Sequence, residues 1–471
     1  MKTFKINEKE DSCNASVGTD SLCSTPAPEN TPVSGTWSKD TNAHLPVAII
    51  GAGPIGLAAA AHLVKEKIPF VLLENGDKVA HNIISWQHVS LFSPWEYNMD
   101  PVAKSLLEET NWVEPNGEEL PTGKELRDKY LIPVSELASI RPFIQLDTKV
   151  ISIARKENDK MKTDNRNKQP FVIYTERHGE IQLIEARAVI DATGTWGNPN
   201  PSTSNGVWLQ AERELHEQIS YGIPNISENV KRYGNKQVAV VGGGHSAINS
   251  LIELAALQED YPNTKITWIM RKKRAEDAYG GEESDALEAR GALGSRIHKL
   301  VDNGRIQVLT PFYILSVKNK DGQIGVQGSI NGEIQESPLF DEMIVNAGNR
   351  PDFSLEQELR ISIDSATESI EALSPLIDPN EHSCGTVRAH GEEILRQPEQ
   401  GLYIVGAKSY GRAPTFLMAT GYEQVRSIVS YLSGDNEAAR RVELNLPETG
   451  VCSLNLQKDK EESSCSTTSC S

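Results

Sequence analysis

The chain has 471 residues, which is too long for one compact hydrophobic core and favours two or three domains. Its 47 Lys and Arg residues against 65 Asp and Glu residues give a formal net charge of −18. A surplus of negative charge opposes binding to a nucleic-acid backbone or an anionic membrane surface. We therefore expect no nucleic-acid partner and no membrane partner, and the length favours an enzyme over a small binding module.

Both ends of the chain have the composition of disordered tails. Residues 1–45 and 455–471 are rich in Ser, Thr, Asn and Glu and poor in large apolar side chains, so they bury too little surface to offset the entropy of ordering. The N-terminal stretch lacks the apolar run of a secretory signal, and glycines interrupt the longest apolar run elsewhere. We expect a cytoplasmic protein without a transmembrane helix.

The first ordered segment, 47–75, predicts a strand, a glycine-rich turn, a helix and a second strand. Gly51, Gly53 and Gly56 have the GxGxxG spacing, in which the glycines permit a tight turn, close approach of a pyrophosphate and close helix packing. Glu74 ends the second strand, where an acid accepts hydrogen bonds from the hydroxyls of an adenosine ribose. This unit predicts an FAD site.

A second unit of the same kind covers 236–271. Gly242, Gly244 and Ala247 have the GxGxxA spacing, and the four basic residues 271–274 stand where the first unit has its acid. A cationic cluster there suits a 2′-phosphate, which favours NADPH over NADH. Arg271 is the preferred contact because it follows the strand directly and its forked guanidinium suits phosphate, although any single member of the cluster is equally explained as a solvated surface charge.

Each unit is followed by segments typical of an antiparallel meander and then by a buried strand that ends in glycine. The meander segments after the first unit lie between 148 and 194, with a polar loop at 157–169, and those after the second lie between 305 and 352. The fold class predicted is α/β, with two Rossmann-like domains and the NADPH domain inserted in the FAD domain. The predicted ranges are 1–45 for the N-terminal tail, 46–235 for the first part of the FAD domain, 236–335 for the NADPH domain, 336–435 for the second part of the FAD domain, and 436–471 for a C-terminal segment with a cysteine-containing tail.

Five motifs occur in an order that resembles the two-dinucleotide-binding-domain flavoproteins, and within them the flavin-containing monooxygenase-like group. They are "GAGPIG" at 51–56, "DATG" at 191–194, "GGGHSA" at 242–247, "NAGNRPD" at 346–352 and "GLYIVGAKSYGRAPTFLMATGYEQVRSIV" at 401–429. The resemblance implies FAD and NADPH as cofactors. It also implies that "ATG" lies where the chain crosses between domains near the flavin, and that the stretch from Gly401 forms the last FAD strand and the helix beneath the isoalloxazine.

The residues predicted to bind the two cofactors come from these motifs, from the ends of the second strands of the two units, and from "SWQH" at 85–88. They are Gly51, Gly53, Pro54, Ile55, Gly56, Glu74, Trp86, Thr193, Gly194, Gly242, Gly244, His245, Ser246, Arg271, Lys272, Gly348 and Gly406. Ala192, Gln87 and His88 are further candidates beside the flavin. Trp86 is explained equally well by core packing and by contact with the flavin ring, whereas His88 is better explained by core packing. No catalytic side chain and no metal site is predicted.

The chain also departs from the family pattern. After "ATG", monooxygenases typically have FxGxxxHxxx(Y/F), which His216 and Tyr221 match only weakly, and the last FAD motif has Gly406-Ala407 in place of Gly-Asp. The nearest resemblance is to bacterial flavin-binding monooxygenases, some of them associated with metal or arsenic resistance. The substrate does not follow from that resemblance.

The six cysteines form no CxxC pair, so neither a zinc knuckle nor a redox-active CxxC pair is predicted. Cys384 is either a buried inert thiol or a nucleophile that faces the substrate. Cys452, Cys465 and Cys470 lie near the C-terminus, where they are either without specific function or able to carry electrons or capture a thiophilic ion.

The function predicted is hydride transfer from NADPH to FAD, followed by oxygenation of a small substrate with O₂ through a flavin C4a-hydroperoxide. One alternative is a reductase that passes electrons to a thiol, metal or metalloid acceptor without oxygenation. A second alternative is a non-catalytic sensor that binds the dinucleotides. For the assembly, a homodimer is an open alternative.

Overall fold

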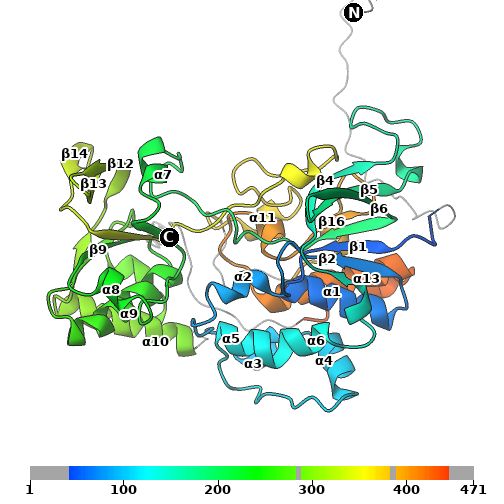
Figure 1. The fold of residues 1–471 in the computed structure, drawn as a ribbon, viewed down its shortest axis with the longest axis horizontal. Helices are drawn as coiled ribbons and strands as arrows, with labels where there is room; N and C mark the ends of the chain where they lie inside the picture. The colour runs from blue at the N-terminus through cyan, green and yellow to red at the C-terminus, as the bar shows by residue number, and fades with distance from the viewer. Residues whose placement is uncertain (1–41, 283–287, 382–388, 445–471) are drawn as a thin grey trace, which may run out of the picture. The chain divides into compact units, whose positions relative to one another are not determined.

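The computed structural model describes residues 42–282, 288–381 and 389–444 (Figure 1). Its strands form two five-stranded sheets and two three-stranded sheets. Each five-stranded sheet is entirely parallel, and each three-stranded sheet is an antiparallel meander. The mixed α/β fold with duplicated parallel sheets confirms the predicted fold class.

The first parallel sheet has the strand order β16-β7-β1-β2-β3. Its strands are β1 (Val47–Ile50), β2 (Phe70–Leu73), β3 (Ile144–Gln145), β7 (Ala188–Asp191) and β16 (Leu402–Ile404). Every residue of β1, β2, β7 and β16 is buried, which explains why these strands are apolar throughout, except for Asp191 at the end of β7. The last strand of the chain thus pairs with β7 and completes a sheet that began at residue 47.

The second parallel sheet has the order β11-β10-β9-β15-β8, in which β9 occupies the place of β1. Its strands are β8 (Ile219–Tyr221), β9 (Gln237–Val241), β10 (Lys265–Ile269), β11 (Ile306–Leu309) and β15 (Glu342–Val345). The predicted range 236–335 for the NADPH domain leaves out β8 and β15. Both belong to this sheet, because β15 pairs in parallel with β9 and β8 pairs in parallel with β15.

The first meander has the strands expected from the sequence. In the second, residues 306–309 belong to the parallel sheet instead, and residues 333–336 form a strand that the sequence did not predict. The first consists of β4 (Lys149–Arg155), β5 (Phe171–Arg177) and β6 (Glu180–Ala186), and the second of β12 (Tyr313–Lys320), β13 (Gln323–Ile330) and β14 (Glu333–Glu336). The inward side chains of β4 and β5 share one core with β1, β2 and β7. The inward side chains of β12 and β13 likewise share a core with β9, β10 and β15, so each meander covers the parallel sheet of its own half.

The long helices pack on the parallel sheets (Figure 1). Helix α1 (Pro54–Lys65) contacts α13 (Met418–Ser433) and α4 (Pro101–Glu108), while α9 (His245–Asp260) contacts α10 (Glu288–Asp302). Residues 55–63 of α1 are all buried, which matches the small and apolar sequence of this helix. The short helices are α2 (His81–Ile84), α3 (Trp95–Asn98), α5 (Gly123–Glu125), α6 (Ile132–Ser135), α7 (Gln210–Glu214), α8 (Val230–Tyr233), α11 (Ser374–Ile377), α12 (Glu392–Leu395) and α14 (Asn436–Arg440). Within the described ranges, every helix is too short or too polar to cross a membrane.

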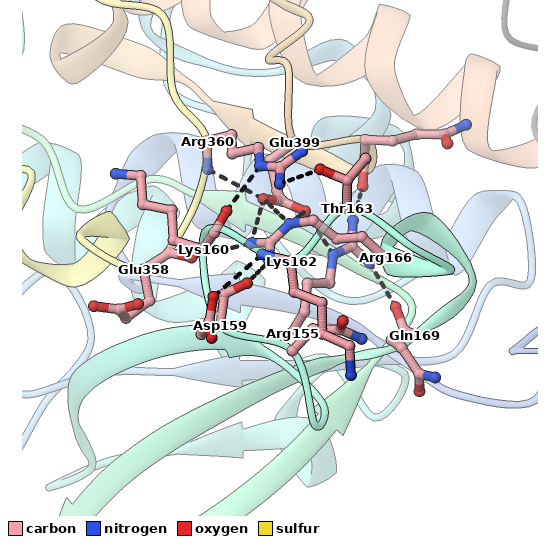
Figure 2. Close-up of polar contacts among 12 residues, drawn as sticks. Arg155, Asp159, Lys160, Lys162, Thr163, Arg166, Gln169, Glu358, Arg360 and Glu399 are labelled. Atoms are coloured by element: carbon pink, nitrogen blue, oxygen red, sulfur yellow. Dashed lines mark hydrogen bonds and ion pairs between the residues drawn. The ribbon is translucent and has the colours of Figure 1, made fainter. Parts of the chain in front are cut away.

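A buried ion cluster fixes the polar loop 157–169 (Figure 2). The side chain of Glu399 is fully buried and accepts hydrogen bonds from Arg155 Nε at 2.7 Å and from Arg166 Nη2 at 2.7 Å. The backbone N–H of Arg360 donates to the same carboxylate at 3.1 Å, and the Arg360 side chain donates to backbone carbonyls of the loop. One carboxylate thereby joins the first meander, its loop and the segment before β16.

Candidate functional site

The first glycine turn leaves open space at the N-terminus of α1. Gly51 has φ +98°, and a Cβ there would lie 2.8 Å from the Ala192 carbonyl oxygen. A Cβ at Gly56 would lie 1.8 Å from the Gly51 oxygen, whereas a Cβ at Gly53 would meet nothing within 4 Å. Pro54 is the first residue of the helix, so the free N–H groups of the first turn face this open space. The turn therefore has room for the pyrophosphate that the sequence predicts here.

Glu74 directly follows β2 and is half-buried. Its Oε2 accepts from the Ala52 N–H at 2.7 Å and its Oε1 accepts from the Gly76 N–H at 2.8 Å. Two of about four lone-pair positions on the carboxylate are thereby used, which leaves capacity for ribose hydroxyls. The same two bonds fix the carboxylate against the glycine turn, so the residues present here fit the adenosine half of FAD.

The second glycine turn repeats this geometry at the end of β9. Gly242 has φ +131°, and a Cβ there would lie 2.3 Å from the Asn346 oxygen. Gly244 precedes the first residue of α9, His245, and a Cβ at Gly244 would meet nothing within 4 Å. The third position, Ala247, is fully buried, while Ser246 lies in the first turn of the helix. This turn also fits a pyrophosphate.

The basic cluster after β10 is divided by its contacts. Arg271 is exposed and its Nη1 donates to the Ser204 oxygen at 3.1 Å. The aliphatic part of Lys272 passes over the turn, since a Cβ at Gly243 would lie 3.4 Å from Lys272 Cδ. Arg274 instead forms an ion pair with Asp277 at 2.9 Å. The Lys272 ammonium also contacts Asp277, since it donates to the Asp277 carbonyl oxygen. Among these three residues the contacts therefore favour Arg271 as the predicted 2′-phosphate contact.

Replacing Arg271 by alanine is expected to raise the KM for NADPH much more than the KM for NADH, because only NADPH loses a charge-assisted contact. We expect a discrimination of about 1–3 kcal/mol in kcat/KM between the nucleotides. Steady-state kinetics with both nucleotides measure it. Arg274→Ala removes the same charge from the residue paired with Asp277 and serves as the control. An unchanged NADPH-to-NADH ratio in Arg271→Ala would assign the 2′-phosphate to other residues.

The first and last sequence motifs meet around Ile55. A Cβ at Gly406, which has φ +69°, would lie 3.2 Å from Ile55 Cγ1, and a Cβ at Gly421 would lie 2.5 Å from Ile55 Cδ1. The Gly406 N–H donates to Gln424 Oε1 at 2.8 Å. The start of α1, the turn after β16 and helix α13 are therefore neighbours, as the predicted FAD site requires.

The "ATG" turn is held by the residue before it. Asp191, the last residue of β7, accepts from the Thr193 N–H at 2.9 Å and from the Thr193 hydroxyl at 2.7 Å, and Gly194 has φ +70°. Gly348, by contrast, lies where two crossing segments pair, since the Asn200 N–H donates to its carbonyl oxygen at 2.9 Å. The structure thus places Thr193 and Gly194 beside the first glycine turn, whereas Gly348 has a role in the crossover between the two sheets.

Two tryptophans form a half-buried wall that the sequence indicated only in part. The ring centroids of Trp86 and Trp196 lie 6.1 Å apart, and Trp196 Nε1 donates to the Ser85 hydroxyl at 2.9 Å. Trp196 was not predicted, although it follows "DATG" by two residues. His88 is half-buried, and burial lowers its pKa. A neutral imidazole there fits core packing, the preferred interpretation of His88.

Sequence patterns did not predict a buried cluster of three charged residue types at the end of β7. The ammonium group of Lys408 lies 2.5 Å from Asp191 Oδ2 and 3.1 Å from Glu356 Oε1, and all three side chains are fully buried. Burial and the negative charge of Asp191 raise the pKa of Glu356 to about 9. Burial also opposes ionisation of Asp191, but the charge of Lys408 outweighs it and holds the pKa of Asp191 at about 2. The charge of Lys408 thus favours the ionised form of Asp191, while burial beside Asp191 favours the protonated form of Glu356.

Two further sets of sequence candidates do not assemble into a site. His216 is exposed and contacts the Arg213 carbonyl, while Tyr221 lies on β8 and donates to Glu212 at 2.9 Å, so these two do not form the monooxygenase fingerprint. Cys384 and the cysteines near both termini lie outside the described residues.

Comparison with known proteins finds a match over most of the chain. Residues 48–383 match the family described as pyridine nucleotide-disulphide oxidoreductase. A ferredoxin–NADP reductase of Latilactobacillus sakei is 21% identical over 361 residues, which cover 75% of this chain and 89% of the relative. These matches confirm the predicted group of two-dinucleotide-binding flavoproteins.

Solved structures agree with this fold. The bacillithiol disulfide reductase Bdr of Bacillus cereus superposes with a TM-score of 0.60 at 19% identity, covering 83% of this chain and 99% of that one. The FAD-bound cadaverine monooxygenase DfoA of Erwinia amylovora superposes with a TM-score of 0.59 at 13% identity, covering 86% of this chain and 98% of that one. The fold therefore occurs in both a reductase and a monooxygenase.

Proposed function

The chain belongs to the pyridine nucleotide-disulphide oxidoreductase family, and from this premise we propose that it is an NADPH-dependent FAD monooxygenase that acts on a small molecule. Membership of the family confirms the predicted cofactor pair, FAD and NADPH, and the class of flavin-dependent oxidoreductase. We propose both the fate of the electrons after they reach the flavin and the residues that hold each cofactor.

The observation that carries the proposal is the pair of open glycine turns with opposite charge at their second strands. The turn at Gly53 adjoins the carboxylate of Glu74, which suits the uncharged ribose hydroxyls of FAD. The turn at Gly244 adjoins Arg271 and Lys272, which suit a 2′-phosphate. Two turns that differ in this way select two different dinucleotides, one as bound cofactor and one as hydride donor.

Bound FAD would supply the ability to take a hydride from nicotinamide and pass electrons on, while the protein supplies binding and orientation. Gly51, Gly53 and Gly56 would hold the pyrophosphate, and the turns at Thr193 and Gly406 would hold the ring system. The wall formed by Trp86 and Trp196 would limit the access of water to this region, since their rings are half-buried and in contact. Exclusion of water favours oxygenation over the unproductive release of peroxide.

Two features support oxygenation as the fate of the electrons. The superposition with DfoA and the motif order agree with a monooxygenase. In addition, the sequence contains no cysteine between residues 24 and 383, so the motifs at 51–56, 191–194 and 242–247 lack a redox-active cysteine pair. A reductase that passes electrons to a thiol, metal or metalloid acceptor is the second candidate, and the superposition with Bdr favours it.

A screen of small substrates for stimulated NADPH oxidation separates the two candidates. We expect a stimulating compound to consume one O₂ per NADPH and to carry one oxygen atom from ¹⁸O₂ in its product. The reductase is supported instead if disulfide, metal or metalloid acceptors sustain NADPH oxidation without oxygen. If neither oxygen nor any acceptor reoxidises the reduced flavin, the result supports the non-catalytic sensor instead.

A further inference from the structure

The turns that follow β7 and β16 are neighbours because these strands are paired in parallel. Ile404 on β16 lies opposite Asp191 on β7, so both strands end at the same edge of the sheet. The turn after β7 contains Thr193, and the turn after β16 is the short 3₁₀ helix η7 (Gly406–Tyr410). Both belong to the predicted FAD site, and the following inference rests on that prediction.

Asp191 connects the two turns through its two carboxylate oxygens. Its Oδ1 accepts both hydrogen bonds from Thr193, and its Oδ2 accepts from the ammonium group of Lys408 in η7. Because the side chains of Asp191 and Lys408 are fully buried, water does not compete for these bonds. A shift of η7 would therefore pull on the Thr193 turn through one charged pair.

Helix α13 holds the other side of η7. Gln424 accepts from the Gly406 N–H at 2.8 Å and donates to the Ser409 hydroxyl at 3.0 Å, and that hydroxyl donates to the Gly406 oxygen at 2.7 Å. The backbone of η7 is thus set by α13 on one side and by Lys408 on the other. Ala407 occupies the position of the usual acid and offers no polar side chain, so placement of the backbone matters more here.

Fold stability alone does not account for this cluster. Well-packed apolar side chains often replace a buried ion pair at no cost in stability, since charges must be stripped of water to be buried. Here Lys408 is covered by the Phe353 ring at 5.2 Å and contacts Glu356, which ends the segment η6 (Ser354–Glu356). The cluster joins three segments that are distant in the sequence. Its directed charge contacts fix the positions of these segments relative to one another, whereas apolar side chains could pack in several arrangements.

We propose that Lys408 is a positioning residue for the flavin: through Asp191 it fixes the Thr193 turn relative to the Gly406 turn, and so keeps both in the arrangement that binds FAD. Lys408 itself is fully buried, so it acts through these turns. Glu356 completes the cluster as a neutral partner, and Glu356→Gln is expected to leave FAD affinity nearly unchanged.

The test compares Lys408→Met with the double variant Lys408→Met/Asp191→Asn. The double variant contains no unpaired buried charge, and its new amide oxygen at position 191 still accepts from Thr193, so it is expected to fold even if the single variant does not. FAD affinity is measured by titration of the apoprotein, and the visible circular dichroism of the saturated protein reports on the surroundings of the bound ring. Thermal unfolding of each apoprotein measures stability separately.

If Lys408 positions the turns, the double variant regains the stability of the wild type but binds FAD about tenfold more weakly, the cost of one lost charge-assisted contact, with an altered dichroism spectrum. If Lys408 only neutralises Asp191, the double variant regains both the affinity and the spectrum, and the proposal is wrong. Failure of the wild-type apoprotein to bind FAD would instead refute the cofactor site itself, which distinguishes the two conclusions.

Discussion

Replacing Gly56 by alanine is expected to yield a protein that purifies without flavin. The added Cβ would lie 1.8 Å from the Gly51 carbonyl oxygen, so α1 must move away from the end of β1. Overpacking of this kind costs about 1–3 kcal/mol of stability, and the upper end applies because both clashing groups are held by the backbone. The flavin content is read from the visible absorbance of the purified protein, and the stability from urea unfolding.

Gly117→Ala is the matched control for this substitution. Its Cβ would meet only Glu96 Cβ at 3.9 Å, an ordinary van der Waals contact, and it lies outside the glycine turn. We expect this control to keep its flavin and its unfolding midpoint. A Gly56→Ala protein that remains yellow at full occupancy would show that the close packing of α1 on the turn at Gly51 is not required for the FAD site.

Replacing Glu399 by glutamine is expected to cost about 3–5 kcal/mol of stability, because it removes the anion from a buried cluster with two guanidinium groups. Both arginine side chains are 3% exposed, so neither gains much hydration to compensate. The midpoint of urea unfolding measures this change. Glu358→Gln provides the control, since the side chain of Glu358 is exposed beside the same cluster (Figure 2).

The pH dependence of this stabilisation follows from the pKa of Glu399. Burial alone would raise the pKa, but hydrogen bonds from Arg166 and Arg155 outweigh it and lower the pKa in the folded protein. A lowered folded-state pKa means that the stabilisation is complete above the ordinary value of about 4.3 and is lost as the pH falls through the folded-state value. The stability difference between wild type and Glu399→Gln should therefore shrink in acid. A constant difference from pH 7 to pH 3 would contradict the ionised state of Glu399.

Local patterns were sufficient to predict the two glycine turns and the longer strands, but not the short strands β3, β8 and β14. At Gly51 and Gly242 the backbone has positive φ and passes close to a carbonyl oxygen, which glycine permits and other residues resist, so the spacing alone indicates the structure. The predicted range 236–335 contains three strands of the second parallel sheet, while β8 lies before that range and β15 after it. With only three residues, Ile219–Tyr221, strand β8 gives little periodicity, and only its pairing with β15 identifies it as a strand of this sheet.

The buried charges were not predictable in the same way. The partners of Lys408 lie 52 and 217 residues away, and Glu399 lies more than 230 residues from either arginine. The spacing of residues along one sequence does not indicate contacts between segments that are so far apart in the chain. The sequence does contain a weaker indication for Lys408. It is the one charged residue in the mostly apolar stretch 401–411, which includes the last predicted FAD strand and is expected to be buried.

Anaerobic titration of the purified protein with NADPH tests the central claim most directly, because it requires both dinucleotide sites and hydride transfer between them. We expect a yellow protein whose visible flavin absorbance is bleached by one equivalent of NADPH, with NADH far less effective. A colourless protein that fails to take up FAD, or a bound flavin that NADPH does not reduce, would contradict the assignment of FAD to the turn at Gly51 and of NADPH to the turn at Gly242.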